Sequence, residues 1–263
     1  MLAEEIICNN YTEFQVLMGI FNAGTINTNK DRKELHFYRH LIHKKIISRI
    51  FHWFSSKKIR AVIFNLLKIT GFNPERSYKI IDVSCGYDDL VIKLAQKFRN
   101  SEVIGNDICD KQLLSIPRKS EINNITLTKR NILSNEFCEN ENYDLIICKN
   151  TLHHLSYSDQ LSLLKKLIKG GKNVIIVEIE NPLKYSFFSY IWNFYYRKFL
   201  KDDGSNFLSS NNFISIILNA KENIPFVKVF HTSLKTIKGN YLFTLIRTDK
   251  NQQNQQQYLG EID

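Results

Sequence analysis

Residues 80–90 read IIDVSCGYDDL, which is the strongest pattern in the sequence. An apolar run leads to an acid at Asp82, a tight turn follows around Gly86, and a helical pattern begins near Asp89. After the first strand of a parallel sheet, backbone N–H groups of such a turn can hold a carboxylate or phosphate, and small residues let the ligand approach the backbone. The stretch therefore indicates a nucleotide-type binding turn in an α/β sheet.

Short strands and helices alternate from Lys79 onward. Runs rich in Val, Ile and Leu predict strands at 79–84, 102–106, 125–129, 143–149, 173–178, 226–230 and 241–247. Helices are expected at 89–98, 110–119, 158–169 and 210–220, the third ending at the stop signal Gly170-Gly171. The alternation is typical of βαβ units and predicts an α/β, doubly wound, mostly parallel sheet of seven strands.

A second acid, Asp107, marks the tip of the second expected strand. A carboxylate in that place can accept both hydroxyls of a ribose. A dinucleotide-binding fold would use the same acid, but its first turn needs G-x-G-x-x-G, whereas Gly86 is the only glycine between Asp82 and Gly105. An NAD site is therefore disfavoured.

Three motifs, in order, resemble those of the class I, S-adenosylmethionine-dependent methyltransferases. They are the turn at 82–90, the acidic strand tip at 105–108 and the run YDLIICKNTLHHL at 143–155. The resemblance covers roughly residues 76–247. It implies a Rossmann-like sheet with an antiparallel last strand, methyl transfer from S-adenosylmethionine, and a cofactor across the tips of strands one, two and four.

The resemblance also implies which residues bind the cofactor. The turn around Ser84 and Gly86 would cradle its methionine portion, Asp107 would bind the ribose, and the pair Asn131-Ile132 would lie by the adenine. Asp82 would orient the turn or the cofactor's amino group. The implied set is Asp82, Ser84, Cys85, Gly86, Asp107, Ile108, Asn131, Ile132 and Lys149.

Three positions depart from the family's usual pattern. Ser84 and Asp88 stand where glycine is usual, and Asn131 where an acid is usual. Asp88 brings negative charge towards the expected cofactor carboxylate, so cofactor affinity is in question. The structural alternative is that Asp82 and Asp107 are strand-end or cap residues.

Two histidines, His153 and His154, follow the fourth strand where a methyl acceptor should meet the sulfonium. Either could take a proton from an acceptor hydroxyl or amine. The alternative is that they shape the pocket while transfer proceeds by proximity alone. Past the fifth strand, Glu178 and Glu180 could contact substrate or form a salt bridge to the N-terminal segment.

Residues 1–75 are expected to form a helical cap, with an amphipathic helix at 35–54, a second helix at 57–69 and a break at 71–74. His36, His40 and His43 share helical spacing, but no thiolate or carboxylate partner is evident, so no metal is expected. The basic face suits solvent or peripheral contact with anionic lipid.

The methyltransferase domain is expected at 76–250, with a polar, Asn/Gln-rich tail at 251–263. An aromatic-rich insertion at about 181–208 suits a lid over an apolar or flat acceptor, with plain packing as the alternative.

The composition favours an intracellular protein that binds negatively charged partners. The net charge is +10 among 263 residues, which suits RNA, anionic lipid or an acidic small molecule, but compositional drift would produce the same charge. Five cysteines without a C-x-x-C pair indicate reduced thiols, and neither a signal peptide nor a membrane-spanning run is recognised, so a cytoplasmic location is expected.

The function expected is methyl transfer to a small, hydrophobic or aromatic acceptor. One alternative is an RNA or protein acceptor, although the fourth strand ends in CKNT and lacks an Asn/Asp-Pro-Pro-aromatic pattern. The other alternative is a methyltransferase-like scaffold without catalysis. The oligomeric state is not predicted.

Overall fold

The computed structural model describes residues 48–86, 89–114, 116, 122–138, 141–180, 204, 206–222, 224, 227–236 and 239–248, with side chains from Ser56 onward. The predicted histidine cluster at 36–43, nearly all of the aromatic insertion at 181–208 and the tail at 251–263 lie outside the described residues.

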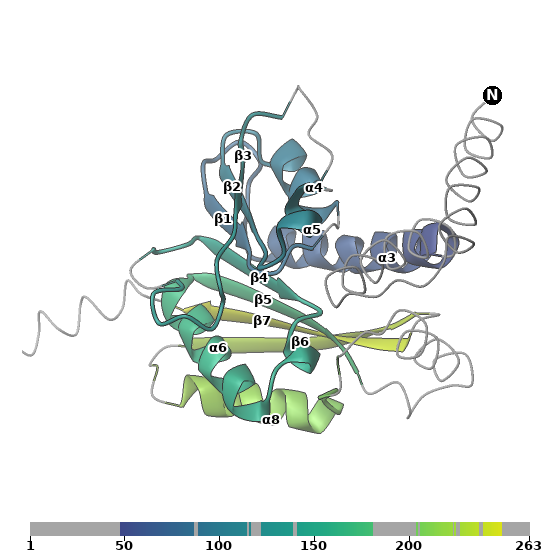
Figure 1. Ribbon diagram of the computed structural model, residues 1–263, viewed down its shortest axis with the longest axis vertical. Helices are drawn as coiled ribbons and strands as arrows, with labels where there is room; N and C mark the ends of the chain where they lie inside the picture. The colour runs from purple at the N-terminus through teal and green to yellow at the C-terminus, as the bar shows by residue number, and fades with distance from the viewer. Residues whose placement is uncertain are drawn as a thin grey trace, which may run out of the picture.

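Seven strands form one sheet in the order β3-β2-β1-β4-β5-β7-β6 (Figure 1). Their bounds are β1 Lys79–Asp82, β2 Glu102–Asn106, β3 Ile125–Thr128, β4 Leu145–Lys149, β5 Asn173–Ile179, β6 Val227–Thr236 and β7 Gly239–Thr248. The first five run parallel, whereas β7 runs antiparallel to both β5 and β6. This confirms the predicted doubly wound, mostly parallel seven-stranded α/β sheet.

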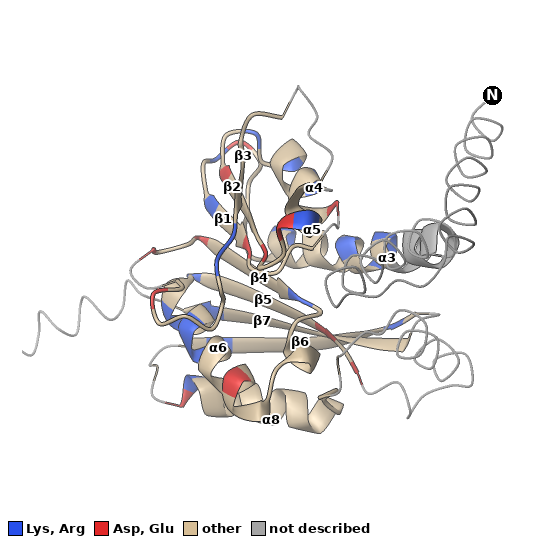
Figure 2. Cartoon of the chain, in the orientation of Figure 1, with Lys and Arg blue, Asp and Glu red and all other residues tan. Residues whose placement is uncertain are grey.

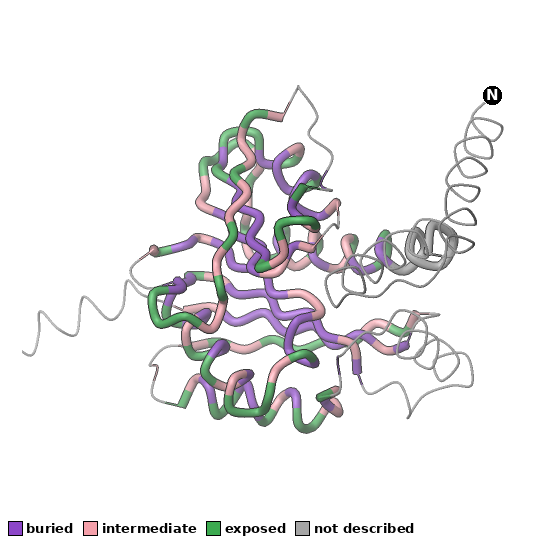
Figure 3. The backbone as a smooth tube through the Cα atoms, in the orientation of Figure 1, coloured by how far each residue is buried: buried purple, intermediate pink, exposed green. Residues whose placement is uncertain are grey.

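The helices divide between the two faces of the sheet. They are α3 Ser48–Ile69, α4 Leu90–Lys97, α5 Asp110–Leu114, the 3-10 turn η1 Leu152–His154, α6 Tyr157–Gly170 and α8 Ser210–Lys221. Apolar residues of α6 and α8 share one core cluster with alternate residues of the strands, and those of α3, α4 and α5 share the other. The central strands are consequently buried on both sides (Figure 3).

Helix α3 corrects the prediction of two helices, one at 35–54 and one at 57–69. Residues 48–69 form one continuous helix, in which Ser56, near the predicted break, is buried. Ile59, Ile63 and Leu67 recur at helical spacing and pack in the core cluster that includes β1 and β4. The described part of the N-terminal segment is therefore integral to the core, while residues before 48 lie outside the described chain.

The glycine pair at the end of α6 matters for its lack of side chains and not for an unusual backbone conformation. Gly170 lies within the helix, and Gly171 has an extended φ of −118° that any residue adopts. A Cβ on Gly170 would lie 2.9 Å from Cys138 Cβ, and one on Gly171 would lie 2.9 Å from Ile146 Cδ1. Gly170 therefore needs glycine, because the Cys138 backbone leaves no room for a Cβ, whereas a side chain at Gly171 would require Ile146 to shift.

Helix α5 and strand β6 compare differently with their predicted lengths. Helix α5 is described over Asp110–Leu114, and most of the predicted remainder up to 119 lies outside the described residues. Strand β6 extends to Thr236 rather than ending near 230, because it pairs with β7 along its whole length. Among the described helices, none is both long and apolar enough to cross a membrane.

Candidate cofactor and active site

The candidate site lies at the carboxyl ends of β1, β2, β4 and β5. These strands are parallel, so the residues that follow them meet at one edge of the sheet. The chain order reverses between β1 and β4, which makes this edge the switch point where ligands of open α/β sheets bind.

The glycine turn after β1 is fixed by the acid after β2. Gly86 adopts a left-handed φ of +56°, and its N–H donates to Asp107 Oδ2 at 2.9 Å. Asp107 Oδ1 accepts the N–H of Cys109 at 2.8 Å, and Cys85 N–H donates to the Asn106 carbonyl at 2.9 Å. The structure thus brings two of the predicted site residues, Gly86 and Asp107, into direct contact.

Cys85 lies among the charged groups of the same turn. Burial raises the pKa of its thiol, the carboxylates of Asp82 and Asp107 raise it further, and Lys149 lowers it slightly. Three predicted site residues from three strand tips therefore influence one thiol. This thiol stays protonated at neutral pH, so Cys85 serves as a small buried residue of the turn and not as a nucleophile.

Two further predicted contacts differ in exposure. Ile108, next to Asp107, is 65% exposed and presents an apolar side chain beside the acid. Ser84 is partly buried in the turn itself.

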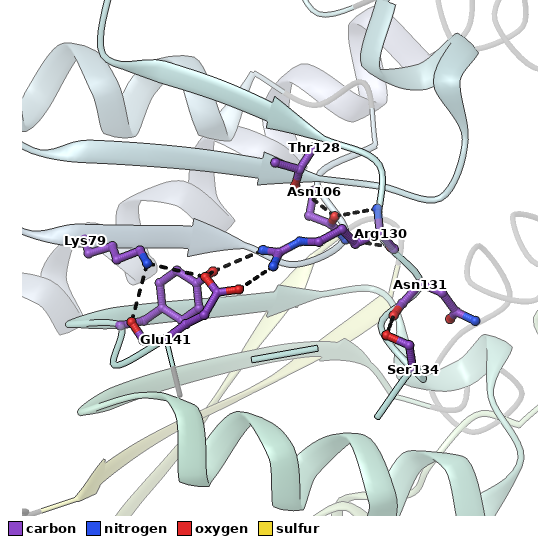
Figure 4. A network of polar contacts seen from close by, with 8 residues as sticks. Lys79, Asn106, Thr128, Arg130, Asn131, Ser134 and Glu141 are labelled. Atoms are coloured by element: carbon purple, nitrogen blue, oxygen red, sulfur yellow. Dashed lines mark hydrogen bonds and ion pairs between the residues drawn. The ribbon is translucent and has the colours of Figure 1, made fainter. Parts of the chain in front are cut away.

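After β3, Asn131 and Ile132 have local structural contacts. Asn131 Oδ1 accepts the Leu133 N–H at 3.0 Å and its carbonyl accepts Ser134 Oγ at 2.9 Å (Figure 4), while Ile132 packs against the core beside α6. Asn131 therefore shapes the turn that leaves β3, at the edge where adenine was expected.

Asn106, which sequence reasoning missed, ties three strand ends together. Its Nδ2 donates to the carbonyls of Val83 at 3.0 Å and Arg130 at 3.1 Å. Its Oδ1 accepts Thr128 Oγ1 at 3.0 Å and Arg130 N–H at 2.9 Å (Figure 4). This fully bonded, buried amide holds the tips of β1, β2 and β3 at fixed spacing beneath the glycine turn.

Figure 4 also shows a cluster of charged side chains next to the Asn106 network, formed around Arg130 and Glu141. The Arg130 guanidinium pairs with Glu141 and donates to Tyr143 Oη at 3.1 Å, and Lys79 Nζ lies 3.4 Å from Glu141 Oε2. Burial raises the pKa of Glu141, but hydrogen bonds from Tyr143 and Arg130 outweigh it and hold that pKa below its ordinary value. The cluster fixes the loop after β3 against the entry to β4.

His153 and Glu178 form a buried pair at the tips of β4 and β5. His153 Nδ1 lies 2.6 Å from Glu178 Oε1, and Glu178 Oε2 accepts the N–H groups of Thr151 at 3.1 Å and Leu152 at 2.8 Å. Burial raises the pKa of Glu178, but His153 and the backbone hydrogen bonds outweigh it and hold the pKa below its ordinary value. Glu178 is therefore an ionised carboxylate that orients His153.

The two histidines differ in their surroundings. His153 is 6% exposed and its ring stacks on Phe207, with centroids 5.0 Å apart and an interplanar angle of 6°, whereas His154 is exposed. Phe207 lies at the end of the predicted lid at 181–208, so stacking places that end beside the imidazole. The two histidines are adjacent in the sequence, and only the structure shows which of them is buried and bonded to Glu178.

Glu180, which was considered for a substrate contact, makes structural hydrogen bonds. Its Oε1 accepts the Ser210 N–H at 2.9 Å, and its Oε2 accepts Asn240 Nδ2 at 2.6 Å. These bonds join the end of β5 to the start of α8 and to β7.

The strand order and the strand-tip site are those of a class I, S-adenosylmethionine-dependent methyltransferase. Residues 80–171 match a family model described as a methyltransferase domain. Over these residues the chain is therefore a methyltransferase domain, whose methyl donor is S-adenosylmethionine. Comparison with curated proteins gives no match.

Solved structures share the fold at low sequence identity. An O-methyltransferase family protein from Burkholderia thailandensis has a TM-score of 0.59 at 10% identity, covering 93% of this chain and 70% of its own. Magnesium protoporphyrin IX methyltransferase from Synechocystis PCC 6803, with bound S-adenosylhomocysteine (SAH), has 0.55 at 15%, covering 91% and 96%. The plantazolicin methyltransferase in complex with SAH has 0.57 at 12%, covering 83% and 98%.

The donor and acceptor groups at the strand tips fit this cofactor. A carboxylate has about four lone-pair positions, and two of those on Asp107 hold the Gly86 and Cys109 N–H groups, so acceptor capacity remains for ribose hydroxyls. The exposed side chain of Ile108 beside it suits the face of a flat base.

Proposed function

We propose that this enzyme transfers the methyl group of S-adenosylmethionine to a small, hydrophobic or aromatic acceptor, at oxygen, nitrogen or carbon. The observation that carries the proposal is the contact of Asp107 with the Gly86 N–H, since it joins the ribose-binding acid to the glycine turn. A cytoplasmic location is part of this proposal and is supported by the free cysteines Cys85, Cys109, Cys138 and Cys148.

Residues at the tips of β1, β2 and β4 would hold the cofactor. Ser84 and Gly86 would bind the methionine portion, Asp107 the ribose, and Ile108 with the turn at 131–132 the adenine. When bound, S-adenosylmethionine supplies a sulfonium methyl group that is open to in-line displacement.

His153 would act as the proton acceptor and Glu178 as its positioning residue. Because Nδ1 of His153 donates to Glu178, the other ring nitrogen, Nε2, carries the lone pair that takes a proton. Burial of the pair and stacking on Phe207 hold the ring in one orientation. An acceptor hydroxyl or amine would give its proton to Nε2 as the bond to the methyl carbon forms.

A small acceptor is supported by two observations. Phe207 presents an aromatic ring beside His153, and the rest of the aromatic-rich insertion precedes it in the chain. Several proteins of the same fold are named for small acceptors or for natural-product pathways, including magnesium protoporphyrin IX and calicheamicin biosynthesis.

Calorimetric titration with S-adenosylmethionine and SAH tests the cofactor site. We expect micromolar-range binding by the wild type and loss of at least about tenfold in affinity for Asp107→Asn, because one charge-assisted acceptor is removed, equivalent to about 1.4 kcal/mol. Asp110→Asn is the matched control, since Asp110 is exposed and pairs with Lys129. A folded wild type that binds neither ligand would instead support the scaffold alternative.

The proton acceptor is tested by His153→Ala, with His154→Ala as the matched control. We expect His153→Ala to lower the rate of methyl transfer by about 10²-fold or more at unchanged SAH affinity, because general base catalysis is typically worth that much. His154→Ala should change the rate little. Equal rates for wild type and His153→Ala, measured on an acceptor panel, would mean that proximity alone drives transfer.

A further inference from the structure

Residues 206–208 lie against η1, the turn that carries His153. The Asn206 N–H donates to the His153 carbonyl at 3.0 Å, and Asn206 Nδ2 donates to the Leu155 carbonyl at 2.9 Å. The Phe207 ring lies parallel to the imidazole of His153, with centroids 5.0 Å apart. Segment 206–208 therefore contacts the candidate proton acceptor both through its backbone and through a side chain.

Gln160 of α6 joins this segment to η1. It is 1% exposed, and its Nε2 donates to the Leu152 carbonyl at 2.8 Å and to the carbonyls of Leu155 and Asn206, both at 3.3 Å. An amide nitrogen has two protons to donate and an amide oxygen has none, so three carbonyls around Nε2 fix which end of the amide faces them. One buried amide therefore bridges both sides of the contact.

A stacked ring restrains a motion of the imidazole that one hydrogen bond leaves free. Nδ1 of His153 lies 2.6 Å from Glu178 Oε1, and that bond fixes one edge of the ring. The ring can still tip about this edge unless a parallel surface covers its face. Phe207, at an interplanar angle of 6°, is such a surface, whereas the ring of His154 lies at 39°. Proton transfer requires the accepting nitrogen to stay aligned, so tipping would lower the rate.

We propose that Gln160 and Asn206 are positioning residues, which hold segment 206–208 on η1 so that Phe207 keeps the His153 imidazole in one orientation. The inference rests on the proposed function, in which His153 is the proton acceptor. The hydrogen bonds that both side-chain amides donate end on backbone carbonyls. Their effect therefore reaches the imidazole through the position of Phe207.

Four variants and one control separate the two amides from the stacked ring. Gln160→Met keeps an unbranched side chain of similar length without the donor, and Asn206→Asp keeps the shape without Nδ2. Phe207→Leu removes the aromatic face, whereas Phe207→Tyr retains it. Asn219→Asp is the matched control, because Asn219 is an exposed amide that joins α8 to Tyr157 Oη at 3.4 Å. Asn206 is exposed, so its variant tests the proposal even if Gln160→Met does not fold.

Proton exchange at the His153 ring tests the proposal without any methyl transfer. In protein labelled with ¹⁵N-histidine, the buried Nδ1 proton should exchange slowly with solvent, and its NMR signal is assigned by its absence from His153→Ala. Losing one net hydrogen bond shifts a local opening equilibrium about fivefold. We expect exchange to be faster by at least that factor in Gln160→Met, Asn206→Asp and Phe207→Leu. It should be unchanged in Phe207→Tyr and in Asn219→Asp.

Kinetics on an acceptor that the wild type methylates gives a second readout. Gln160→Met, Asn206→Asp and Phe207→Leu should each lower kcat about fivefold or more at unchanged SAH affinity, because the same local opening misaligns the ring. Phe207→Tyr should retain the wild-type kcat. In the His153→Ala background, Phe207→Leu should have no further effect, because it acts through the imidazole.

The proposal is overturned if proton exchange in Gln160→Met and Asn206→Asp matches that of the wild type, or if Asn219→Asp accelerates it equally. It is also overturned if Phe207→Leu lowers kcat as much in the His153→Ala background as in the wild type. Failure of the proposed function is a separate result. If His153→Ala leaves kcat unchanged, His153 is not the proton acceptor, while the exchange rates still decide whether the two amides fix its ring.

Discussion

Glu178 shows how one carboxylate organises the residues after β4. Both of its oxygens accept backbone N–H groups, from Thr151 and Leu152 on one side and from Ile179 on the other, and one of them also bonds His153. Burying a charge is costly unless such partners compensate for it. The residue that orients the imidazole therefore also holds the backbone of η1 in place.

Glu178→Gln should destabilise the protein at neutral pH and should do so less in acid. The pKa of Glu178 is lowered in the folded state, so its stabilisation is present above the unfolded-state pKa of about 4.3 and is lost as pH falls through the folded-state pKa. We expect a loss of about 1–3 kcal/mol at pH 7, because Gln cannot accept all the buried N–H groups that the carboxylate accepts. Denaturant unfolding at pH 7 and at several values below about 4.3 measures the difference.

The exposed residue Glu136 provides the control for this prediction. Glu136→Gln should change the free energy of unfolding by less than about 0.5 kcal/mol at any of these pH values. A stability difference for Glu178→Gln that stays constant with pH would show that its ionisation is not the source of the stabilisation.

Residues of the site were predictable where a local pattern marks them. Gly86 and Asp107 follow apolar strands, and the structure joins them by a hydrogen bond. Asn106 and Glu178 form their bonds with segments about 25 residues away, which only strand pairing brings near. Their neighbours in the sequence give no sign of these partners, so Asn106 was missed and the role of Glu178 stayed open.

Among the helices and strands, the ends of buried elements were predicted more accurately than the ends of exposed ones. β1, β2, β4 and β5 are short, mostly apolar runs that are largely buried, and β3 is a partly buried edge strand; all five begin and end within about two residues of the prediction. β6 was predicted too short because its second half is mostly exposed and polar, from His231 to Thr236. Two helices were predicted around 48–69, whereas the structure has one continuous helix whose residues Ile59, Ile63 and Leu67 pack in a single core cluster.

Helix α3 offers a matched pair of substitutions for its role in the core. Ile63 is fully buried and Ile69 is 78% exposed, on the same helix. We expect Ile63→Ala to lower the free energy of unfolding by about 2–5 kcal/mol, because it leaves a cavity against β1 and β4. Ile69→Ala should cost less than about 0.5 kcal/mol. Equal losses in denaturant unfolding would mean that α3 does not pack as described.

For the whole molecule, the arrangement of charge bears on the kind of acceptor. Although the chain has a net charge of +10, Figure 2 shows Lys and Arg spread over several elements and interspersed with Asp and Glu. The described acids Asp89, Asp110, Glu141 and Asp144 each pair with a Lys or Arg. Such pairing reduces the field available to attract a polyanion.

The salt dependence of activity distinguishes a small acceptor from RNA. A protein that contacts 6–10 phosphates loses about 10³–10⁵ in affinity between 50 and 200 mM salt, because condensed counterions are no longer released favourably. For a small uncharged acceptor we expect kcat/KM to change by less than about threefold over that range, since only screened steering is affected. Methyl transfer at both salt concentrations, with RNA binding measured in parallel, decides between them. If both kcat/KM and the affinity for RNA fell a hundredfold or more over this range, RNA would replace a small molecule as the proposed acceptor.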